Sequence, residues 1–328
     1  MSLNMMDMHC DTLMKAMLEN KQDIYENAAT MVDIKRLTDN GYLAQFFAIF
    51  VVPETMYREG LHMDPIPSEE CILRCHQIFE HTMQQHEAVV SKATTVDRIM
   101  ENAAKGKLSA VLTMEDGVAV DGRMENLDRF YDMGVRALAL TWNYENCFGY
   151  PNSRETKIMA QGLKPFGKEA VAYMQDKGIL VDVSHLSDGG FYDVADIAKK
   201  PFIASHSNCR ELSNHPRNLT DDMLKIFGNT GGVTGLNFCP DFLTNDAKNK
   251  ESSVEMIVAM AKHMKQIGGI DIIGVGTDFD GIEGSLEISG CEKMNLLADG
   301  LSRNGFTTGE IEKIMSGNLL RVMRDAVK

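Results

Sequence analysis

The sequence predicts an α/β protein of the (β/α)8 class, a TIM barrel. Short apolar runs alternate with helix-like segments along nearly the whole chain of 328 residues. Side chains suited to metal binding or acid–base chemistry follow several of these runs directly. A doubly wound open sheet would carry a glycine-rich phosphate loop after its first strand, whereas this chain continues there as His9-Cys10-Asp11. A closed barrel is therefore the favoured architecture.

Eight runs rich in Val, Ile, Leu, Ala or Met are expected to be the strands. They are Met5–His9, Tyr42–Val52, Leu108–Met114, Val135–Thr141, Ile179–Ser184, Pro201–Ser205, Gly231–Phe238 and Ile272–Thr277. The run at Tyr42–Val52 is almost entirely apolar, as expected for a strand covered on both faces. Pro53 ends it, and residues 53–68, which contain three prolines, are expected to be a long loop.

Helical periodicity fills the intervals between these runs. The expected helices are Thr12–Asn20, Asp33–Thr38, Glu69–Val90, Val96–Lys105, Leu127–Met133, Pro165–Lys177, Gly190–Lys199, one opening at Thr220, Ser252–Ile267, and one from Thr307 to about Ala326. Gly134 and Gly178 are placed to stop two of them, and Thr220 is a good N-cap.

The composition fits a folded protein with a full core, because 44% of the residues are hydrophobic and 24% are charged. We find no internal repeat, low-complexity tract or linker, so we expect residues 1–328 to form one domain. The net charge of -14 argues against a nucleic-acid surface and against a polybasic membrane patch. A homodimer would be ordinary for such a protein.

The seven cysteines form no even framework, which is typical of reduced thiols in a cytosolic protein. The first residues lack the basic segment of a secretory signal, and no apolar run approaches the ~20 residues of a membrane span. We therefore expect a cytoplasmic protein with no membrane partner.

The side chains at the predicted strand ends form the ligand set of a two-metal hydrolase. They are His9, Asp11, Glu115, His185, His206 and Asp278. The carboxyl ends of barrel strands converge on one mouth, so these distant residues are expected to be neighbours. Imidazoles and carboxylates suit zinc, and also manganese or cobalt. Taken singly, each residue is more often structural, and it is their combination that favours a metal site.

Two metals require a bridging carboxylate, and Asp11, Glu115 and Asp278 are the candidates. A hydroxide between the metals would be the nucleophile, because metal binding lowers the pKa of water towards neutrality. A second metal site at Cys71, Cys75 and His76 is the less favoured interpretation, since structural zinc usually uses paired Cys-x-x-Cys knuckles.

The motifs of the chain resemble those of the membrane (renal) dipeptidase family of zinc metallopeptidases, in its soluble microbial branch. The matching pieces are Asp7-Met8-His9-Cys10-Asp11, Glu115-Asp116-Gly117, Leu140-Thr141, Val183-Ser184-His185, Ser205-His206-Ser207, Pro216-Arg217-Asn218 with Asp221-Asp222, and Gly276-Thr277-Asp278-Phe279-Asp280-Gly281. The resemblance covers essentially the whole chain, with its motifs in the same order.

The resemblance implies two zinc ions per chain. His9 and Asp11 would hold one, His185 and His206 would hold the other, and Glu115 would bridge them. It also implies that Asp278 handles the proton between the attacking water and the leaving amine. Arg217 would bind the terminal carboxylate of the substrate, a task suited to a planar guanidinium.

The chain departs from the family pattern at Trp142. Better-known members carry a histidine directly after Leu-Thr, thought to steady the tetrahedral intermediate, whereas Trp142 offers only an N–H donor. Asn143, Tyr144 and Asn146 are candidate substitutes, and we place Trp142 and Asn143 in the substrate-binding set. Loss of one oxyanion donor costs ~10²–10³ in rate in other enzymes.

The resemblance predicts a dipeptidase that cleaves free dipeptides, including those with a D-residue at the C-terminal position. The alternative is another amide or lactam hydrolase on the same metal centre. Typical amidohydrolases open with His-x-His and often use a carbamylated lysine on the fourth strand, whereas this chain has His-x-Asp and no lysine near Thr141. A barrel that only binds a ligand is the third hypothesis, and Trp142 alone favours it.

Overall fold

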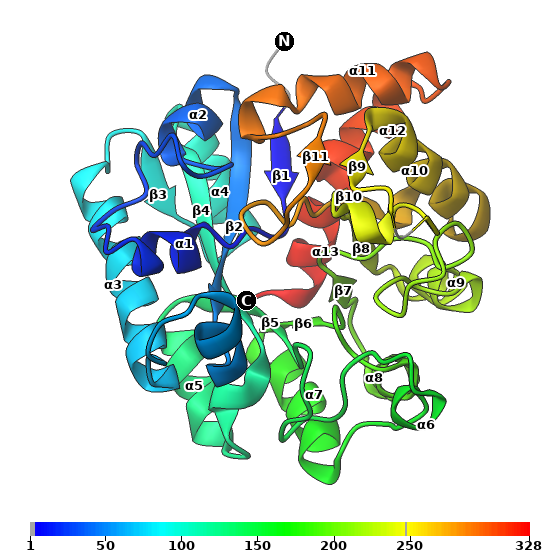
Figure 1. Cartoon of the computed structure of the whole chain (residues 1–328). Coiled ribbons are helices and arrows are strands. Elements are labelled where there is room, and N and C mark those ends of the chain that lie inside the picture. Colours follow the sequence, from blue (N-terminus) through cyan, green and yellow to red (C-terminus); the bar gives the residue numbers. More distant parts are fainter. Residues whose placement is uncertain (1–3, 247) are drawn as a thin grey trace.

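The structure, a computed structural model, describes residues 4–246 and 248–328. Within these residues eight parallel strands close a barrel, as predicted (Figure 1). The strands are β1 (Met5–Asp7), β2 (Tyr42–Phe50), β4 (Leu108–Glu115), β5 (Val135–Ala139), β6 (Leu180–Asp182), β7 (Ile203–Ala204), β8 (Val233–Leu236) and β10 (Ile273–Val275). Their order is β2-β1-β10-β8-β7-β6-β5-β4, and the pairing of β2 with β4 closes the ring.

The closure between β2 and β4 is long and regular. It runs in register from Ala44 opposite Ser109 to Phe50 opposite Glu115. The apolar sequence of β2 follows from its place, because its side chains meet the barrel interior on one face and the helices on the other. The register places the carboxyl end of β2 beside Glu115.

Helices surround the barrel (Figure 1). They are α1 (Thr12–Leu18), α2 (Ile34–Asp39), α3 (Ser68–Gln85), α4 (Val96–Ala104), α5 (Met124–Asp132), α6 (Thr156–Met159), α7 (Pro165–Lys177), α8 (Asp188–Ile197), α9 (Asp221–Thr230), α10 (Val254–Gly268), α11 (Asn295–Arg303), α12 (Thr308–Glu312) and α13 (Asn318–Ala326). The predicted cap at Thr220 is confirmed, since its side chain accepts a hydrogen bond from Met223 N. Gly178 ends α7 at a φ of 94°.

The structure corrects the prediction between residues 53 and 92. Met56–Gly60 form a π-helical turn inside the expected loop. Helix α3 ends at Gln85, five residues earlier than predicted, and Val90–Lys92 become an extra strand, β3, that pairs with β4. A β-branched Val gains a ladder partner there, which helical periodicity alone does not reveal. Helix α11 and the short pair β9 (Glu251–Ser252) and β11 (Ser285–Leu286) were not predicted.

The barrel interior is filled at the amino ends of the strands. One buried apolar cluster joins inward-facing strand residues to residues of α4 and α13; it includes Met6, Phe46, Val111, Ala137, Leu180, Ile203, Val233, Ile99, Leu319 and Val322. A larger cluster lies between the strands and the outer helices. With one end plugged, the carboxyl ends of the strands are left as the functional end. That residues 1–328 form one domain stays a prediction.

The length and hydropathy of the helices bear on the membrane. In the part of the chain that the structure describes, no helix has enough consecutive apolar residues to pass through a bilayer.

Candidate metal centre

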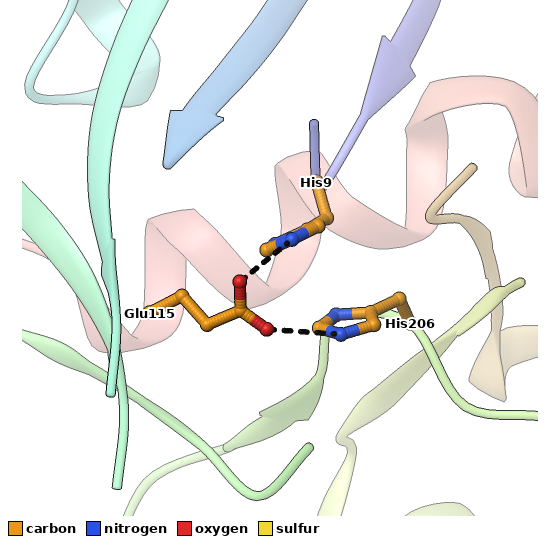
Figure 2. Close-up of side chains that lie close together, drawn as sticks. All are labelled: His9, Glu115 and His206. Atoms are coloured by element: carbon orange, nitrogen blue, oxygen red, sulfur yellow. Dashed lines mark ion pairs between the residues drawn. The ribbon is translucent and has the colours of Figure 1, made fainter. Parts of the chain in front are cut away.

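The predicted site residues gather at the carboxyl end of the barrel. His9 follows β1, Glu115 is the last residue of β4, and His206 follows β7. His185 follows β6 and Asp278 follows β10. Figure 2 shows the Glu115 carboxylate lying between the rings of His9 and His206. All five side chains are buried.

The two oxygens of Glu115 face different imidazoles. Oε2 lies 3.4 Å from His9 Nε2, while Oε1 lies 2.9 Å from His185 Nε2 and 3.6 Å from His206 Nε2. The Nε2 atoms of His185 and His206 are themselves 3.1 Å apart. One carboxylate is thus placed to join His9 on one side to a pair of imidazoles on the other.

Two more carboxylates stand around His9. Its Nε2 lies 3.6 Å from Asp11 Oδ2 and 3.9 Å from Asp278 Oδ1. The structure therefore contains two sets of possible metal ligands, and within each set all ligand atoms lie within 4.8 Å of one another. One set is His9, Glu115 and His206, and the other is His9, Asp11 and Asp278. His9 belongs to both sets.

The donor atoms fit a metal cation. His9 Nε2 and Asp11 Oδ1 are buried and have no hydrogen-bond partner among the described residues. Buried polar atoms of a folded protein are normally paired, so two unpaired atoms on neighbouring members of this cluster indicate a ligand. The set consists of imidazole nitrogens and carboxylate oxygens, which are the donors that zinc takes.

Burial and crowding shift the titration of this cluster. Burial, reinforced by the charges of Asp11 and Asp278, raises the pKa of Glu115 to about 7, although His9 opposes the shift. Burial likewise raises the pKa of Asp278 to about 6. These carboxylates destabilise one another in the absence of a positive charge, and a cation bound among them would relieve this.

The pKa values of the three imidazoles are shifted in opposite directions. Burial lowers the pKa of His9, but the carboxylates of Glu115 and Asp11 outweigh it and hold that pKa well above its ordinary value. Burial, helped by nearby His9 and Arg217, holds the pKa values of His185 and His206 well below the ordinary value. This shift favours the neutral form of both rings, which is the form that binds metals.

Two buried carboxylates to which the sequence analysis gave no role hold the site together. Asp7 accepts hydrogen bonds from His9 N, Thr277 N and Thr277 Oγ1. Asp182 Oδ1 accepts from Ser184 N and Ser205 N, each at 2.9 Å. Each aspartate ties together the ends of two neighbouring strands. Their sequence signal is an acidic residue within an otherwise apolar strand.

Two site residues adopt a backbone conformation that L-residues rarely take. His185 has a φ of 67° and Asp278 a φ of 63°. Such strain persists where the surroundings enforce it, and it is concentrated at functional sites. Sequence periodicity does not reveal these turns.

Arg217 lies beside His206. Its Nη1 donates to Ser207 Oγ at 3.2 Å, and its Nη2 donates to the carbonyl oxygen of His206 at 3.1 Å. The guanidinium lies 5.4 Å from the centre of the Phe242 ring, and the residue is 6% exposed. Its Nε is buried without a hydrogen-bond partner in the described chain. A buried guanidinium with a spare donor is a suitable anchor for an anion.

Trp142 and Asn143 lie next to His185. The Trp142 ring lies 6.1 Å from the His185 ring and 5.0 Å from Phe50. Asn143 Oδ1 lies 3.0 Å from His185 Nδ1. Asn146 turns away, because its Nδ2 donates to Asp116 Oδ1 and to the carbonyl oxygen of Leu140.

The cysteines of α3 belong to the core. Cys71 and Cys75 are fully buried, with Cys71 Sγ donating to the carbonyl oxygen of Phe50. His76 Nε2 lies 3.2 Å from the carbonyl oxygen of Met133. The two ligand sets found among the described residues both lie at the strand-end site, in agreement with the structural interpretation of these cysteines.

Solved structures share this fold. The dipeptidase AC, a metallo peptidase of family M19, matches with a TM-score of 0.88 and 24% identity, over 100% of this chain and 99% of its own. A metallo peptidase from Rhodobacter sphaeroides, liganded with a phosphinate mimic of the dipeptide L-Ala-D-Ala, matches with a TM-score of 0.87 and 24% identity, over 99% of this chain and 100% of its own.

Sequence comparison identifies the family. An uncharacterized dipeptidase from Schizosaccharomyces pombe is 32% identical over 231 residues, covering 70% of this chain and 55% of that protein. An uncharacterized protein in the pqqA 5' region of Klebsiella pneumoniae is 31% identical over 240 residues, covering 71% and 86%. The sequence profile described as Membrane dipeptidase (Peptidase family M19) matches residues 1–328. The chain therefore belongs to the membrane dipeptidase family and is a dipeptidase of the metallopeptidase type.

Proposed function

We propose that this dipeptidase works with two zinc ions and hydrolyses the peptide bond of free dipeptides. The observation that carries the proposal is the orientation of Glu115, whose two oxygens face His9 on one side and His185 with His206 on the other. His9 and Asp11 would hold one ion, His185 and His206 would hold the other, and Glu115 would belong to both.

Bound zinc would lower the pKa of a water molecule and polarise the scissile carbonyl. Asp278 would take the proton of the attacking water and pass it to the leaving amine. Its Oδ2 accepts a hydrogen bond from Asn237 Nδ2 at 2.8 Å, which fixes the carboxylate, and its Oδ1 points towards His9. A general acid–base must be held within reach of the proton it moves, and this carboxylate lies at the edge of the proposed ligand set.

Arg217 would bind the terminal carboxylate of the substrate. Its Nη atoms donate to Ser207 Oγ and to the His206 carbonyl oxygen, and its buried Nε has no acceptor within residues 4–246 and 248–328. A fixed cation close to the proposed metals would leave room for a short substrate only. This arrangement would select two residues, since a longer peptide would place its carboxylate beyond the guanidinium.

We extend the proposal to dipeptides with a D-residue at the C-terminal position. The support is the Rhodobacter sphaeroides peptidase, which is liganded with a mimic of L-Ala-D-Ala and shares the fold of this chain. Trp142 would line the substrate cavity next to His185, together with Phe50.

Elemental analysis of the purified protein and of Glu115→Ala tests the metal centre, with Glu211→Ala at an exposed position as the matched control. We expect two zinc per chain in the parent and in the control, and a sharp fall in Glu115→Ala. A folded parent that takes up no zinc from an excess would refute the proposal, and one zinc per chain would refute its binuclear part.

Hydrolysis of L-Ala-L-Ala, L-Ala-D-Ala and tri-alanine by the zinc-loaded parent tests the substrate. We expect both dipeptides to be cleaved faster than the tripeptide. Failure to cleave L-Ala-D-Ala would remove the extension to D-residues and leave the rest in place.

A further inference from the structure

Asn143 is exposed, yet its side chain is committed to a buried imidazole. Strands β5 and β6 are paired up to Ala139 opposite Asp182, and Leu140 N donates to the Asp182 carbonyl oxygen. The segment after β5 therefore continues beside the segment after β6. This brings Asn143 Oδ1 to 3.0 Å from His185 Nδ1.

The same segment also holds the backbone of His185. The backbone N of Asn152 donates to the His185 carbonyl oxygen at 2.6 Å, and Asn152 Nδ2 donates to it at 3.1 Å. Pro151 pairs with Leu186 in an antiparallel bridge, and Ser187 N donates to the Tyr150 carbonyl oxygen. These contacts enforce the left-handed φ of His185 and so fix the backbone position from which its side chain extends.

An amide oxygen only accepts hydrogen bonds, so Asn143 Oδ1 requires the proton of a neutral His185 ring to be on Nδ1. The lone pair is then on Nε2, the atom that faces Glu115 Oε1 and His206 Nε2. His206 has a less selective neighbour, because Ser205 Oγ, 2.6 Å from its Nδ1, can donate or accept.

We propose that Asn143 is a positioning residue that holds His185 in the Nδ1–H tautomer and so presents Nε2 to the metal. The inference rests on the proposed function, because it requires a metal at His185. It assigns Asn143 a task other than the substrate contact that its sequence position predicts. Partners of this kind on metal-bound histidines typically contribute 10- to 100-fold to metal affinity.

The test compares Asn143→Ala and Asn143→Asp with the parent. Asn214→Ala is the matched control, because Asn214 is also exposed and its hydrogen bond to Asn245 uses the backbone N, which the substitution keeps. Zinc affinity is measured on metal-free protein by competition with a chromophoric chelator, and thermal unfolding of the metal-free proteins checks folding.

We expect the apparent zinc affinity to fall about 10- to 100-fold in Asn143→Ala. We expect the zinc affinity of Asn143→Asp to stay close to that of the parent, because a carboxylate oxygen accepts the same hydrogen bond. The zinc affinity of Asn214→Ala should also stay close to that of the parent. As zinc is added to Asn143→Ala, activity should recover in step with the zinc bound, which a residue that acts only by contacting the substrate would not show.

Two outcomes would overturn the inference in different ways. Unchanged zinc affinity in Asn143→Ala, with a raised KM at saturating zinc, would make Asn143 a substrate-binding residue and leave the metal proposal standing. Failure of the parent itself to bind zinc would remove the proposed function and this inference with it.

Discussion

Asp182 Oδ1 accepts a hydrogen bond from the backbone N of Ser205 at 2.9 Å, and this one contact ties the strand end before His185 to the strand end before His206. The same oxygen accepts from Ser184 N. Asp182 thus fixes the backbone just before His185 and His206, the two proposed ligands, through hydrogen bonds to main-chain N–H groups. Asp7 has the corresponding place between β1 and β10.

Replacing Asp182 by alanine should destabilise the fold. Two buried N–H groups would lose their acceptor, and each such loss costs about 1–3 kcal/mol, so we expect the free energy of unfolding to fall by roughly 2–6 kcal/mol. Asp182→Asn should lose less, because one amide oxygen can accept both bonds. Urea unfolding of the metal-free proteins measures this, with exposed Asp196→Ala as control. Equal stability of Asp182→Ala and the parent would show that these bonds contribute nothing.

Arg217→Lys should lower kcat/KM for dipeptides. Lysine keeps the charge but not the planar fork, and hydrogen bonds to charged groups contribute about 1.5–3 kcal/mol, which corresponds to roughly 10- to 100-fold. Dipeptide amides, which lack the carboxylate, should be cleaved equally poorly by the parent and the variant. If the variant lost activity on amides and on free dipeptides alike, the role assigned to Arg217 would be wrong.

Asp278→Asn should slow the chemical step and leave the metal in place. An amide retains the hydrogen-bonding shape but moves no proton, so kcat should fall about 10²–10⁴-fold. Zinc content, measured alongside steady-state kinetics, should stay at the parent's level. Loss of zinc with the loss of rate would instead make Asp278 a ligand, as its proximity to His9 and Asp11 allows.

His215 should make the fold less stable in acid. Burial first, and then the positive charges of Arg154 and Arg217, lower its pKa to about 4; Arg210 adds to this and Asp241 opposes it. In the unfolded chain a histidine has a pKa near ~6.5, so between these values the unfolded state binds more protons. Stability contributed at neutral pH is therefore lost as the pH falls through this window.

His215→Gln removes that proton uptake. The free energy of unfolding, measured in denaturant at about pH 7 and about pH 5, should fall less in the variant than in the parent. The same replacement at exposed His62 is the control. The prediction would be contradicted if the free energy of unfolding changed by the same amount between the two pH values in the parent and in His215→Gln.

Much of the fold was predictable because strand and helix periods are local properties. The eight apolar runs are the eight barrel strands, and Gly178 and Thr220 mark helix ends where the sequence places them. The candidate ligands were predictable for a related reason: strands that are parallel and closed must bring His9, Glu115 and His206 to one mouth.

Other features depend on contacts between segments far apart in the chain. Val90–Lys92 become a strand only because Leu108–Ala110 of β4, which the pairing with β5 does not reach, offer them ladder partners. Asp182 and Asn143 acquire their roles from neighbouring strands, through hydrogen bonds to Ser205 and His185 that no periodicity encodes.

The class of the barrel and the chemical groups that reach its mouth could be predicted from the order of the residues, because side-chain alternation and strand order suffice for that. How those groups face one another depends on the folded arrangement of the chain. The left-handed turn at His185, the two directions of the Glu115 oxygens and the Nε of Arg217, unpaired among the described residues, each result from packing among several segments. Such packing sets distances and orientations that a linear pattern of residues does not contain.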